Sequence, residues 1–363
     1  MTSSVVIAGG GTGGHLYPGI ALAKALMKHD ADIQITFVGT RQGIESRVLP
    51  REGFRLKTIL SGGLLGKKGI GGLINWLKLP VSILQSMGYL LMNRPRLVVG
   101  VGGYVSGPVA FSAWALRIPM LVHEQNTIPG ATNRWLGKIA NKVAITFEMS
   151  KKYFPAHKVV ETGNMIREEF TEAKEANVPT SGKFTLLVLG GSQGAQSINR
   201  ALMAALDTLE PVKDRLHIIH QTGQSDEAEV QAGYKHKGFS ADARAFIYDM
   251  ADQYSKASLI ICRSGATTLA EVTALGIPSV LVPYPFAAHN HQEHNARALE
   301  SNGAAKVILD KDVNGEQLAQ VIIDGMEHPE TLREMGNKSF QMGRRDATER
   351  VRQLCVELMR SSN

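Results

Sequence analysis

The stretch Val5-Val-Ile-Ala-Gly-Gly-Gly-Thr-Gly-Gly-His15 decides the fold class. A short β-branched run stands directly before a glycine-rich turn, and an apolar stretch with helical spacing follows at 18–27. Strand, glycine turn and helix in this order are typical of the first unit of a parallel α/β sheet. Glycines let a backbone approach a ligand closely, and amides at a helix start favour an anion. The stretch therefore predicts a ligand-binding turn.

The same alternation of short apolar strands and helical stretches continues outward along the chain. It predicts parallel sheets covered on both faces. A polar, turn-rich linker at 177–183 separates two halves, and the second half restarts with a strand and the glycine turn at 190–194. The predicted strands span residues 5–8, 33–38, 55–59, 97–101, 120–123, 142–145, 185–189, 216–220, 259–262 and 279–282, and the predicted helices span 18–27, 197–209, 268–275, 292–302 and 344–359. The chain is thus predicted to be a duplicated α/β architecture.

Composition limits the class of protein. The chain has 363 residues, 44% of them hydrophobic and 20% charged, which excludes a disordered protein. The two cysteines, Cys262 and Cys355, cannot form a disulfide scaffold and indicate a reducing compartment. A net charge of 40 − 33 = +7 suits a phosphorylated substrate or an anionic membrane surface. Aromatic residues make up only 6%, which argues against a nucleic-acid partner.

The first glycine turn also matches the dinucleotide fingerprint, as Gly9-x-Gly11-x-x-Gly14. That pattern needs an acid near the end of the second strand to bind a ribose. The second strand ends Val38-Gly-Thr-Arg41, without an acid at its tip. Because Arg41 suits a 2′-phosphate, an NADP-dependent oxidoreductase stays open as the alternative function. A tight turn without a ligand is the second alternative.

Polar residues follow three strands of the first half. His15 stands at the start of a predicted helix, where a neutral imidazole can act as a base. A second glycine turn, 102–108, follows another strand and could form an anion-binding wall. His-Glu-Gln-Asn at 123–126 ends an apolar strand and suggests a site. A structural histidine, a compact turn and loop capping remain the alternatives.

In the second half, Cys262-Arg-Ser-Gly-Ala-Thr-Thr-Leu-Ala-Glu271 predicts a strand, a turn and a helix. The turn would leave helix amides for an anion, and Glu271 could accept hydrogen bonds from sugar hydroxyls or act as a helix-dipole acid. His291 and His294 lack a third ligand, and we expect a surface helix and no catalytic metal there.

The segment 64–92 is strongly apolar. Leu73, Trp76 and Leu77 fall at i, i+3 and i+4 close to lysines, a pattern that suits an anionic bilayer surface. The alternative is a helix that faces the core. The uninterrupted apolar part, 81–92, is too short to span a hydrocarbon layer of about 30 Å.

Taken together in order, the motifs of this chain resemble those of the MurG family. The motifs are Gly-Gly-Gly-Thr-Gly-Gly-His at 9–15, Gly-Gly-Tyr-Val-Ser-Gly-Pro at 102–108, His-Glu-Gln-Asn at 123–126, Gly-Gly-Ser-Gln-Gly-Ala at 190–195, Arg-Ser-Gly-Ala-Thr-Thr-Leu-Ala-Glu at 263–271 and Asp-Ala-Thr-Glu-Arg at 346–350. The resemblance covers essentially the whole chain. The family comprises N-acetylglucosaminyltransferases that convert lipid I to lipid II in bacterial peptidoglycan synthesis.

This resemblance implies a GT-B fold, with two Rossmann-like doubly wound parallel-sheet domains facing across a cleft. Residues 1–165 with 342–363 would form the acceptor-binding, membrane-associated domain, and residues 166–341 the UDP-GlcNAc-binding domain. The implied reaction is inverting, needs neither metal nor cofactor, and transfers GlcNAc from UDP-GlcNAc to the MurNAc 4-hydroxyl of lipid I. The implied location is peripheral, at the cytoplasmic face of the inner membrane.

The family motifs also imply roles for single residues. His15 is the candidate base and Glu124 its alternative, a choice that the resemblance does not decide. Acceptor contacts fall on Gly103, Tyr104 and Ser106. Donor contacts fall on Thr12, Gly13, Gly14, Asn126, Arg167, Ser192, Ile247, Ala266, Thr267, Thr268, Leu269, Ala270, Glu271 and Gln292. Met165 stands where the family usually has proline, which puts the rigidity of the interdomain hinge in doubt.

Overall fold

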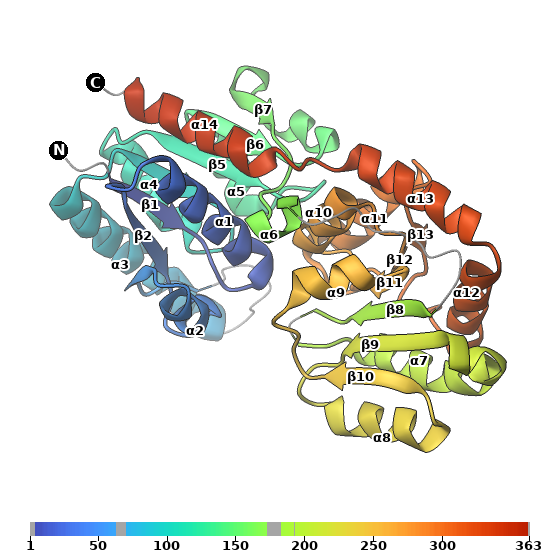
Figure 1. Ribbon diagram of the computed structural model, residues 1–363. Coiled ribbons are helices and arrows are strands. Elements are labelled where there is room, and N and C mark those ends of the chain that lie inside the picture. Colours follow the sequence, from blue (N-terminus) through green and yellow to red (C-terminus); the bar gives the residue numbers. More distant parts are fainter. Residues whose placement is uncertain (1–3, 63–69, 173–182, 192, 362–363) are drawn as a thin grey trace. The chain divides into compact units, whose positions relative to one another are not determined.

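The computed structural model describes residues 4–62, 70–172, 183–191 and 193–361, with the backbone alone at 70–77 and 172. The chain forms two compact units (Figure 1). Unit 1 comprises Met1–Arg167 and Asp346–Asn363, and unit 2 is the continuous segment Glu168–Arg345. Unit 2 is therefore inserted into the sequence of unit 1. The boundaries lie two and four residues after the positions expected from the sequence.

Unit 1 is built on a seven-stranded parallel sheet in the order β3-β2-β1-β4-β5-β6-β7. Its strands are β1 (Ser4–Ala8), β2 (Gln34–Gly39), β3 (Arg55–Thr58), β4 (Leu97–Gly100), β5 (Met120–Glu124), β6 (Lys142–Ile145) and β7 (Val159–Glu161). The order reverses between β1 and β4, where Ala8 pairs with Gly100. Ligands of open α/β sheets bind beyond the carboxyl ends of the strands at such a switch point.

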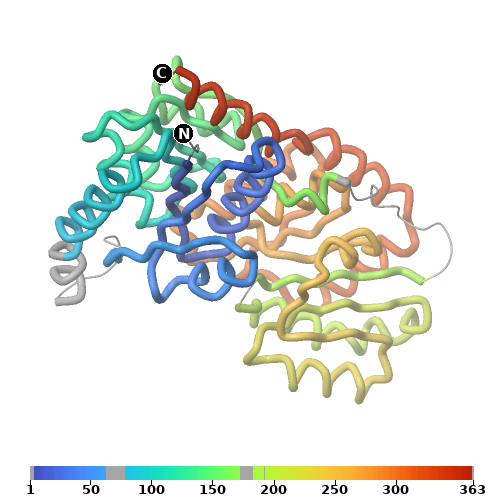
Figure 2. The backbone as a smooth tube through the Cα atoms, turned by 60° about the vertical axis from the view of Figure 1, so that its left-hand side comes forward, coloured from blue at the N-terminus to red at the C-terminus, as the bar shows by residue number. Residues whose placement is uncertain are grey.

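Helices cover both faces of this sheet because its strands are apolar on both sides. Val5 and Ile7 pack in one cluster with α1, α2 and α14, and Val6 and Ala8 pack in another with α3, α4 and α5. The helices of unit 1 are α1 (Gly13–His29), α2 (Glu45–Arg51), α3 (Ile70–Asn93), α4 (Ser106–Ala115), α5 (Ala131–Ile139) and α14 (Ala347–Arg360), with 3₁₀ turns at Glu148–Tyr153 and Ala156–Lys158. Figure 2 shows α14 alongside α1.

Unit 2 repeats this design with a six-stranded parallel sheet in the order β10-β9-β8-β11-β12-β13. Its strands are β8 (Phe184–Leu189), β9 (Leu216–Gln221), β10 (Ser240–Arg244), β11 (Leu259–Cys262), β12 (Ser279–Leu281) and β13 (Lys306–Val307). Its helices are α6 (Glu168–Glu172), α7 (Gln196–Leu209), α8 (Glu227–Lys237), α9 (Met250–Lys256), α10 (Ala266–Leu275), α11 (His291–Glu300), α12 (Gly315–Glu327) and α13 (Pro329–Met342), with 3₁₀ turns at Glu210–Arg215 and Ala288–Asn290. The switch point here lies between β8 and β11.

Some elements differ from the sequence prediction. Helix α1 begins at Gly13, five residues before the predicted start, because Pro18 lies inside the helix instead of in its first turn. Strand β10 was not predicted, since its sequence Ser-Ala-Asp-Ala-Arg lacks the β-branched run of a buried strand and it lies at the sheet edge. Within the described ranges, no helix is long and apolar enough to cross a membrane.

Candidate functional site

The glycine loops that follow β1 and β4 pack directly on each other in unit 1. A Cβ atom on Gly9 would lie 2.4 Å from Cγ2 of Val101, and one on Gly103 would lie 2.7 Å from the carbonyl oxygen of Gly10. The backbone of Gly103 has φ +81°, a conformation that glycine adopts without strain. The glycines therefore allow two loops to meet at the switch point of the sheet.

Glu45 lies beneath the first glycine loop and organises it. Its side chain is fully buried. The Gly11 amide donates to Oε2 over 2.9 Å, and the Thr40 amide and hydroxyl donate to Oε1 over 2.8 and 3.0 Å. The amide that a dinucleotide fingerprint would offer to a pyrophosphate thus binds a carboxyl group of the chain itself. The fingerprint predicts an acid at the strand tip, whereas this acid lies four residues beyond Arg41 and was not predicted.

His15 lies in the first turn of α1 and contacts the neighbouring loops. Its Nδ1 lies 3.3 Å from Oε1 of Gln125. A Cβ atom on Gly102 would approach this Nδ1 to 2.7 Å, so the imidazole packs against the backbone of the second glycine loop. His123 is buried beside Gln125, and burial lowers its pKa to about 4, so it is neutral at physiological pH. His15 was predicted as a site residue by itself, whereas His123 and Gln125 were predicted only as members of the polar run at 123–126.

Glu124, the alternative base, braces the loop that follows β5. Its side chain is buried, and its oxygens accept hydrogen bonds from the Asn126 amide over 2.9 Å and from the Asn133 side chain over 2.9 Å. Burial raises the pKa of this carboxyl group. Asn133, on α5, was not predicted as part of the site, because a single asparagine inside a helical stretch carries no sequence signal. Glu124 and Asn133 together position Asn126.

The predicted acceptor residues occupy the second glycine loop in different ways. Gly103 and Tyr104 are half-buried, and the Tyr104 ring lies against Gly11. Ser106 is fully buried, and its hydroxyl lies 2.7 Å from the Ala8 carbonyl and 2.8 Å from the Gly102 carbonyl. Its hydroxyl therefore ties the loop to β1.

The remaining predicted residues of unit 1 lie at the start of α1, at the end of the unit and on α3. Thr12 and Gly14 are exposed and Gly13 is half-buried. The Arg167 guanidinium lies over the Tyr17 ring, 5.2 Å from its centroid. The side chains of the predicted membrane residues lie outside the described part of the structure: Leu73, Trp76 and Leu77.

In unit 2, Gln221 at the end of β9 links two loops. Its Oε1 accepts from the Ile247 amide over 3.0 Å, and its Nε2 donates to the Gly191 carbonyl over 2.9 Å. Ile247 is buried. Ser192, in the glycine turn, lies outside the described residues. Gln221 was not predicted, because a glutamine at a strand end has no distinctive pattern.

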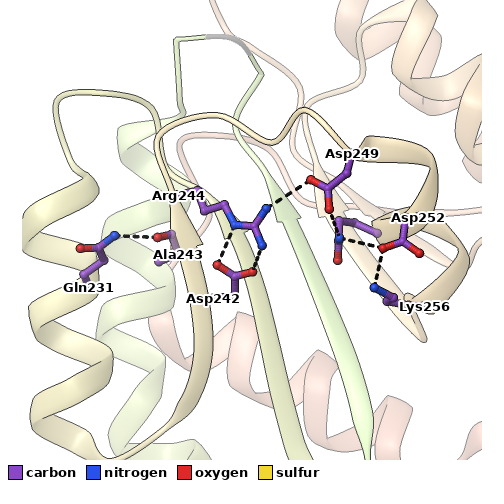
Figure 3. Close-up of polar contacts among 8 residues, drawn as sticks. Gln231, Asp242, Ala243, Arg244, Asp249, Asp252 and Lys256 are labelled. Carbon is purple, nitrogen blue, oxygen red and sulfur yellow. Dashed lines mark hydrogen bonds and ion pairs between the residues drawn. The ribbon is translucent and has the colours of Figure 1, made fainter.

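A surface network holds the segment that carries Ile247, between β10 and α9 (Figure 3). Arg244 bridges Asp242 and Asp249, with Nε 2.8 Å from the Asp242 carboxylate and Nη1 3.2 Å from the Asp249 carboxylate. Gln253 donates to Asp249 over 2.5 Å, and this hydrogen bond lowers the pKa of the Asp249 carboxyl group. Both ends of the 245–249 segment are thereby fixed.

Helix α10 follows β11 at the switch point of unit 2, and its N-cap residue, Gly265, is extended. Along the predicted donor-binding run, Ala266 and Leu269 are buried and Thr267, Thr268 and Ala270 are half-buried. Glu271 is 7% exposed and accepts from the Tyr254 hydroxyl over 3.2 Å. The start of this helix offers backbone amides to an anion.

Gln292, near the start of α11, joins two loops of the same unit. Its Oε1 accepts from the Tyr284 amide over 3.0 Å, and its carbonyl accepts from the Ser264 hydroxyl over 2.8 Å. The neighbouring His291 contacts the Ala288 carbonyl through Nδ1 over 2.8 Å. Among the residues that the structure describes, no group of three His, Cys, Asp or Glu side chains could hold a metal ion.

Comparisons with known proteins place these motifs in a family. Residues 5–145 match the glycosyltransferase family 28 N-terminal domain, and residues 185–351 match the glycosyltransferase family 28 C-terminal domain. The crystal structure of Acinetobacter baumannii MurG superposes with a TM-score of 0.76 at 32% identity, covering 98% of this chain and 99% of that one. The chain belongs to the MurG family of glycosyltransferases.

Two curated relatives of this MurG family member are similar along almost their whole length. The Myxococcus xanthus protein is 44% identical over 98% of this chain and 93% of its own length, and the Geobacter sulfurreducens protein is 46% identical over 96% of each. Both are named UDP-N-acetylglucosamine--N-acetylmuramyl-(pentapeptide) pyrophosphoryl-undecaprenol N-acetylglucosamine transferase.

These findings confirm the predicted α/β GT-B fold, with two parallel-sheet domains, and the predicted class of enzyme, a hexosyltransferase. A UDP-GlcNAc 2-epimerase from Neisseria meningitidis, at 14% identity and a TM-score of 0.68, shares the fold alone. The oxidoreductase alternative finds no support, and the Gly11–Glu45 contact gives a physical reason for the fingerprint glycines without a dinucleotide.

Proposed function

We propose that this glycosyltransferase moves GlcNAc from UDP-GlcNAc to the MurNAc 4-hydroxyl of lipid I and so forms lipid II, a step of peptidoglycan synthesis. The observation that carries the proposal is the 44% identity, over 98% of the chain, with a Myxococcus xanthus transferase named for this donor and acceptor. The glycine motifs, which occur along the chain in the order of the family, support it, and so do the polar residues at the strand ends of both units.

In this proposal, unit 2 binds most of the donor. The Ile247 backbone, fixed by Gln221, contacts the uracil, and Glu271 accepts hydrogen bonds from the ribose. The start of α10, at 266–270, faces the diphosphate together with Ser192, because amides at a helix start attract an anion. Gln292 contacts the GlcNAc hydroxyls. Unit 1 adds donor contacts from Thr12, Gly13, Gly14, Asn126 and Arg167.

His15 is the proposed base, in preference to Glu124. Both Glu124 oxygens accept hydrogen bonds from asparagine side chains that hold its loop, and only 1% of the residue is exposed. His15 is half-buried in the first turn of α1, beside the second glycine loop. A histidine can take a proton near physiological pH, which is what the acceptor hydroxyl requires.

The reaction then follows from these roles. His15 takes the proton of the MurNAc 4-hydroxyl, and the resulting oxygen nucleophile attacks C1 of GlcNAc on the face opposite to UDP. The bond between C1 and the UDP oxygen breaks, and its electron pair stays on the diphosphate. Amides at the start of α10 stabilise that charge as it develops. Because attack and departure occur on opposite faces, the anomeric configuration is inverted.

In this proposal, unit 1 binds the acceptor and contacts the membrane. Gly103 and Tyr104 contact the acceptor, and Ser106 holds their loop in shape through its buried hydroxyl. Leu73, Trp76 and Leu77 rest on the anionic cytoplasmic face of the plasma membrane. The described part of α3 supports this surface, since Leu84 and Met92 are 69% and 85% exposed. Exposed apolar side chains near lysines suit an anionic bilayer.

Calorimetric titration tests the donor first. We expect UDP-GlcNAc to bind selectively, with UDP-glucose weaker and NADPH without effect. Turnover of a lipid I analogue, followed by NMR of the new glycosidic bond, then tests acceptor and inversion. Binding of NADPH alone would overturn the proposal, and so would a product with retained anomeric configuration.

A further inference from the structure

A chain of hydrogen bonds runs from a backbone carbonyl to the ring of His15 through two buried side chains. His123 Nε2 lies 3.1 Å from the Gly163 carbonyl oxygen, and His123 Nδ1 lies 3.1 Å from Nε2 of Gln125. Oε1 of Gln125 then lies 3.3 Å from Nδ1 of His15. His123 and Gln125 are both at most 1% exposed, so solvent does not compete for these groups.

The Gln125 amide has one possible orientation in this network. Its nitrogen lies 2.7 Å from the Val101 carbonyl oxygen, which can only accept. The NH₂ group must therefore face Val101, and the amide oxygen must face His15. An amide oxygen can only accept, so the hydrogen between Gln125 and His15 belongs to Nδ1 of His15.

His123 supports the same assignment independently. The Gly163 carbonyl can only accept, so Nε2 of His123 carries a hydrogen. Burial keeps this imidazole neutral at physiological pH, which leaves a lone pair on its Nδ1. That lone pair accepts the second amide hydrogen of Gln125. Two carbonyls on separate segments, Val101 and Gly163, thus orient Gln125 in the same way.

We propose that Gln125, oriented by His123 and Val101, is a positioning residue that holds His15 in the Nδ1–H tautomer and directs the ring lone pair to Nε2. A neutral histidine can carry its hydrogen on either nitrogen, and its partner decides which. The tautomer itself follows from the contacts of unit 1. Its use in catalysis rests on the proposed function, in which Nε2 takes the acceptor proton.

The tautomer can be measured directly on the full-length protein. Histidine labelled with ¹⁵N, recorded in long-range ¹H–¹⁵N correlations near neutral pH, distinguishes protonated from unprotonated ring nitrogens, and a His15→Gln sample assigns the His15 signals. We expect a protonated Nδ1 and an unprotonated Nε2 for His15. A wild-type spectrum with His15 protonated on Nε2 overturns the proposal, and this result does not depend on any Gln125 variant.

A Gln125→Leu variant tests the cause. We expect its His15 signals to move towards the Nε2–H form and turnover of the lipid I analogue to fall about 10- to 100-fold, less than the loss of about 10²- to 10⁴-fold for removing a general base, because His15 itself remains. The KM for UDP-GlcNAc should stay within about twofold, since other residues hold the donor. A His15 spectrum unchanged in Gln125→Leu overturns the positioning role.

Gln231→Leu is the matched control. Gln231 also donates to a backbone carbonyl, that of Ala243, over 2.7 Å, and it lies at an exposed position in unit 2 (Figure 3). Gln231→Leu should leave both the His15 spectrum and the turnover of the lipid I analogue unchanged. If His15 is Nδ1–H but His15→Ala retains full turnover, the base assignment falls while the tautomer assignment stands. The two proposals therefore fail separately.

Discussion

The main-chain amide of Gly11 donates a hydrogen bond to the carboxyl group of Glu45 over 2.9 Å, although 34 positions separate the two residues. Thr40 closes the arrangement, because its hydroxyl donates to Glu45 and accepts from the Gly43 amide over 3.1 Å. The shape of the first glycine loop is therefore set by a buried acid from the segment after β2, before any ligand binds.

Glu45→Ala should destabilise unit 1. The change removes the buried acceptor of three donors, which are the Gly11 amide and the Thr40 amide and hydroxyl. Because these groups then lack a hydrogen-bond acceptor, we expect a loss of about 3 kcal/mol in the free energy of unfolding. Urea denaturation measures it. Glu52→Gln is the control, since Glu52 pairs with Lys24 at the surface and should change stability by at most about 0.5 kcal/mol. Equal losses for the two variants would contradict the role of Glu45.

Gly102→Ala should impair turnover by displacing His15, the proposed base. The added Cβ would lie 2.7 Å from Nδ1 and 2.8 Å from Cε1 of His15, so the imidazole must move. We expect about a 100-fold loss of turnover, because shifts of about 1 Å have effects of that size. Gly53→Ala is the matched control, since Gly53 also has positive φ, +77°, but nothing lies within 4 Å of its Cβ position. It should cost about 1 kcal/mol of stability and leave turnover unchanged.

His15→Ala should abolish base catalysis but leave the binding of the donor, UDP-GlcNAc, intact. We expect turnover of the lipid I analogue to fall between about 10²- and 10⁴-fold, while calorimetry still detects UDP-GlcNAc. The pH dependence of turnover should lose the contribution of an ionising histidine. Near-normal turnover with an unchanged pH profile would transfer the base role to another residue.

Gln221→Leu should weaken donor binding. The change removes the bonds to the Ile247 amide and to the Gly191 carbonyl, so two loops of unit 2 lose their common anchor. We expect the Kd for UDP-GlcNAc to rise about tenfold. This rise corresponds to a loss of about 1.4 kcal/mol in binding free energy, which is the size of the contribution of one hydrogen bond between uncharged groups. Gln320→Leu, at an exposed position on α12, should leave the Kd unchanged in the same calorimetric titration. Equal affinities of wild type and Gln221→Leu would contradict the anchoring role.

Two buried histidines should make both units sensitive to acid. Burial lowers the pKa of His123 to about 4 and that of His220 to about 3, from 6.5. Between these values the unfolded chain binds protons that the folded chain does not, so stability falls as the pH decreases below 6.5. At pH 5 each histidine should lower the free energy of unfolding by about 2 kcal/mol relative to pH 7.

Urea titrations at pH 7 and pH 5 check this expectation. His220→Gln should reduce the difference between the two pH values, whereas His157→Gln, at an exposed position, should not. A wild-type protein as stable at pH 5 as at pH 7 would be incompatible with two buried neutral histidines.

The fold could be predicted from the sequence because its central strands are unbroken apolar runs. β1, β4, β8 and β11 were all expected, and each is buried on both faces. The two edge strands of unit 2 were harder to predict, since β10 is polar and β13 has only two residues. Their pairing depends on a neighbouring strand that lies far away in the sequence.

The candidate site was predictable where glycine marks a turn, as at 9–14 and 102–107. Glu45 and Gln221 could not be found in this way, and Gln125 was found only as a member of the polar run at 123–126, without its contacts. Each acts through hydrogen bonds to the backbone of a loop distant in the chain, as Glu45 does to Gly11, and such contacts leave no periodicity or spacing in the sequence.

The division of the chain also sets the order in which the protein can be completed during synthesis. Val351 and Cys355 of α14 are buried in the same core as Val5 and Ile7 of β1. A ribosome therefore releases all of unit 2 before it supplies the last apolar face that unit 1 needs. Synthesis of unit 1 begins first and ends last. A chain that ends near residue 345 would therefore contain all of unit 2 but would lack the helix that completes the core of unit 1.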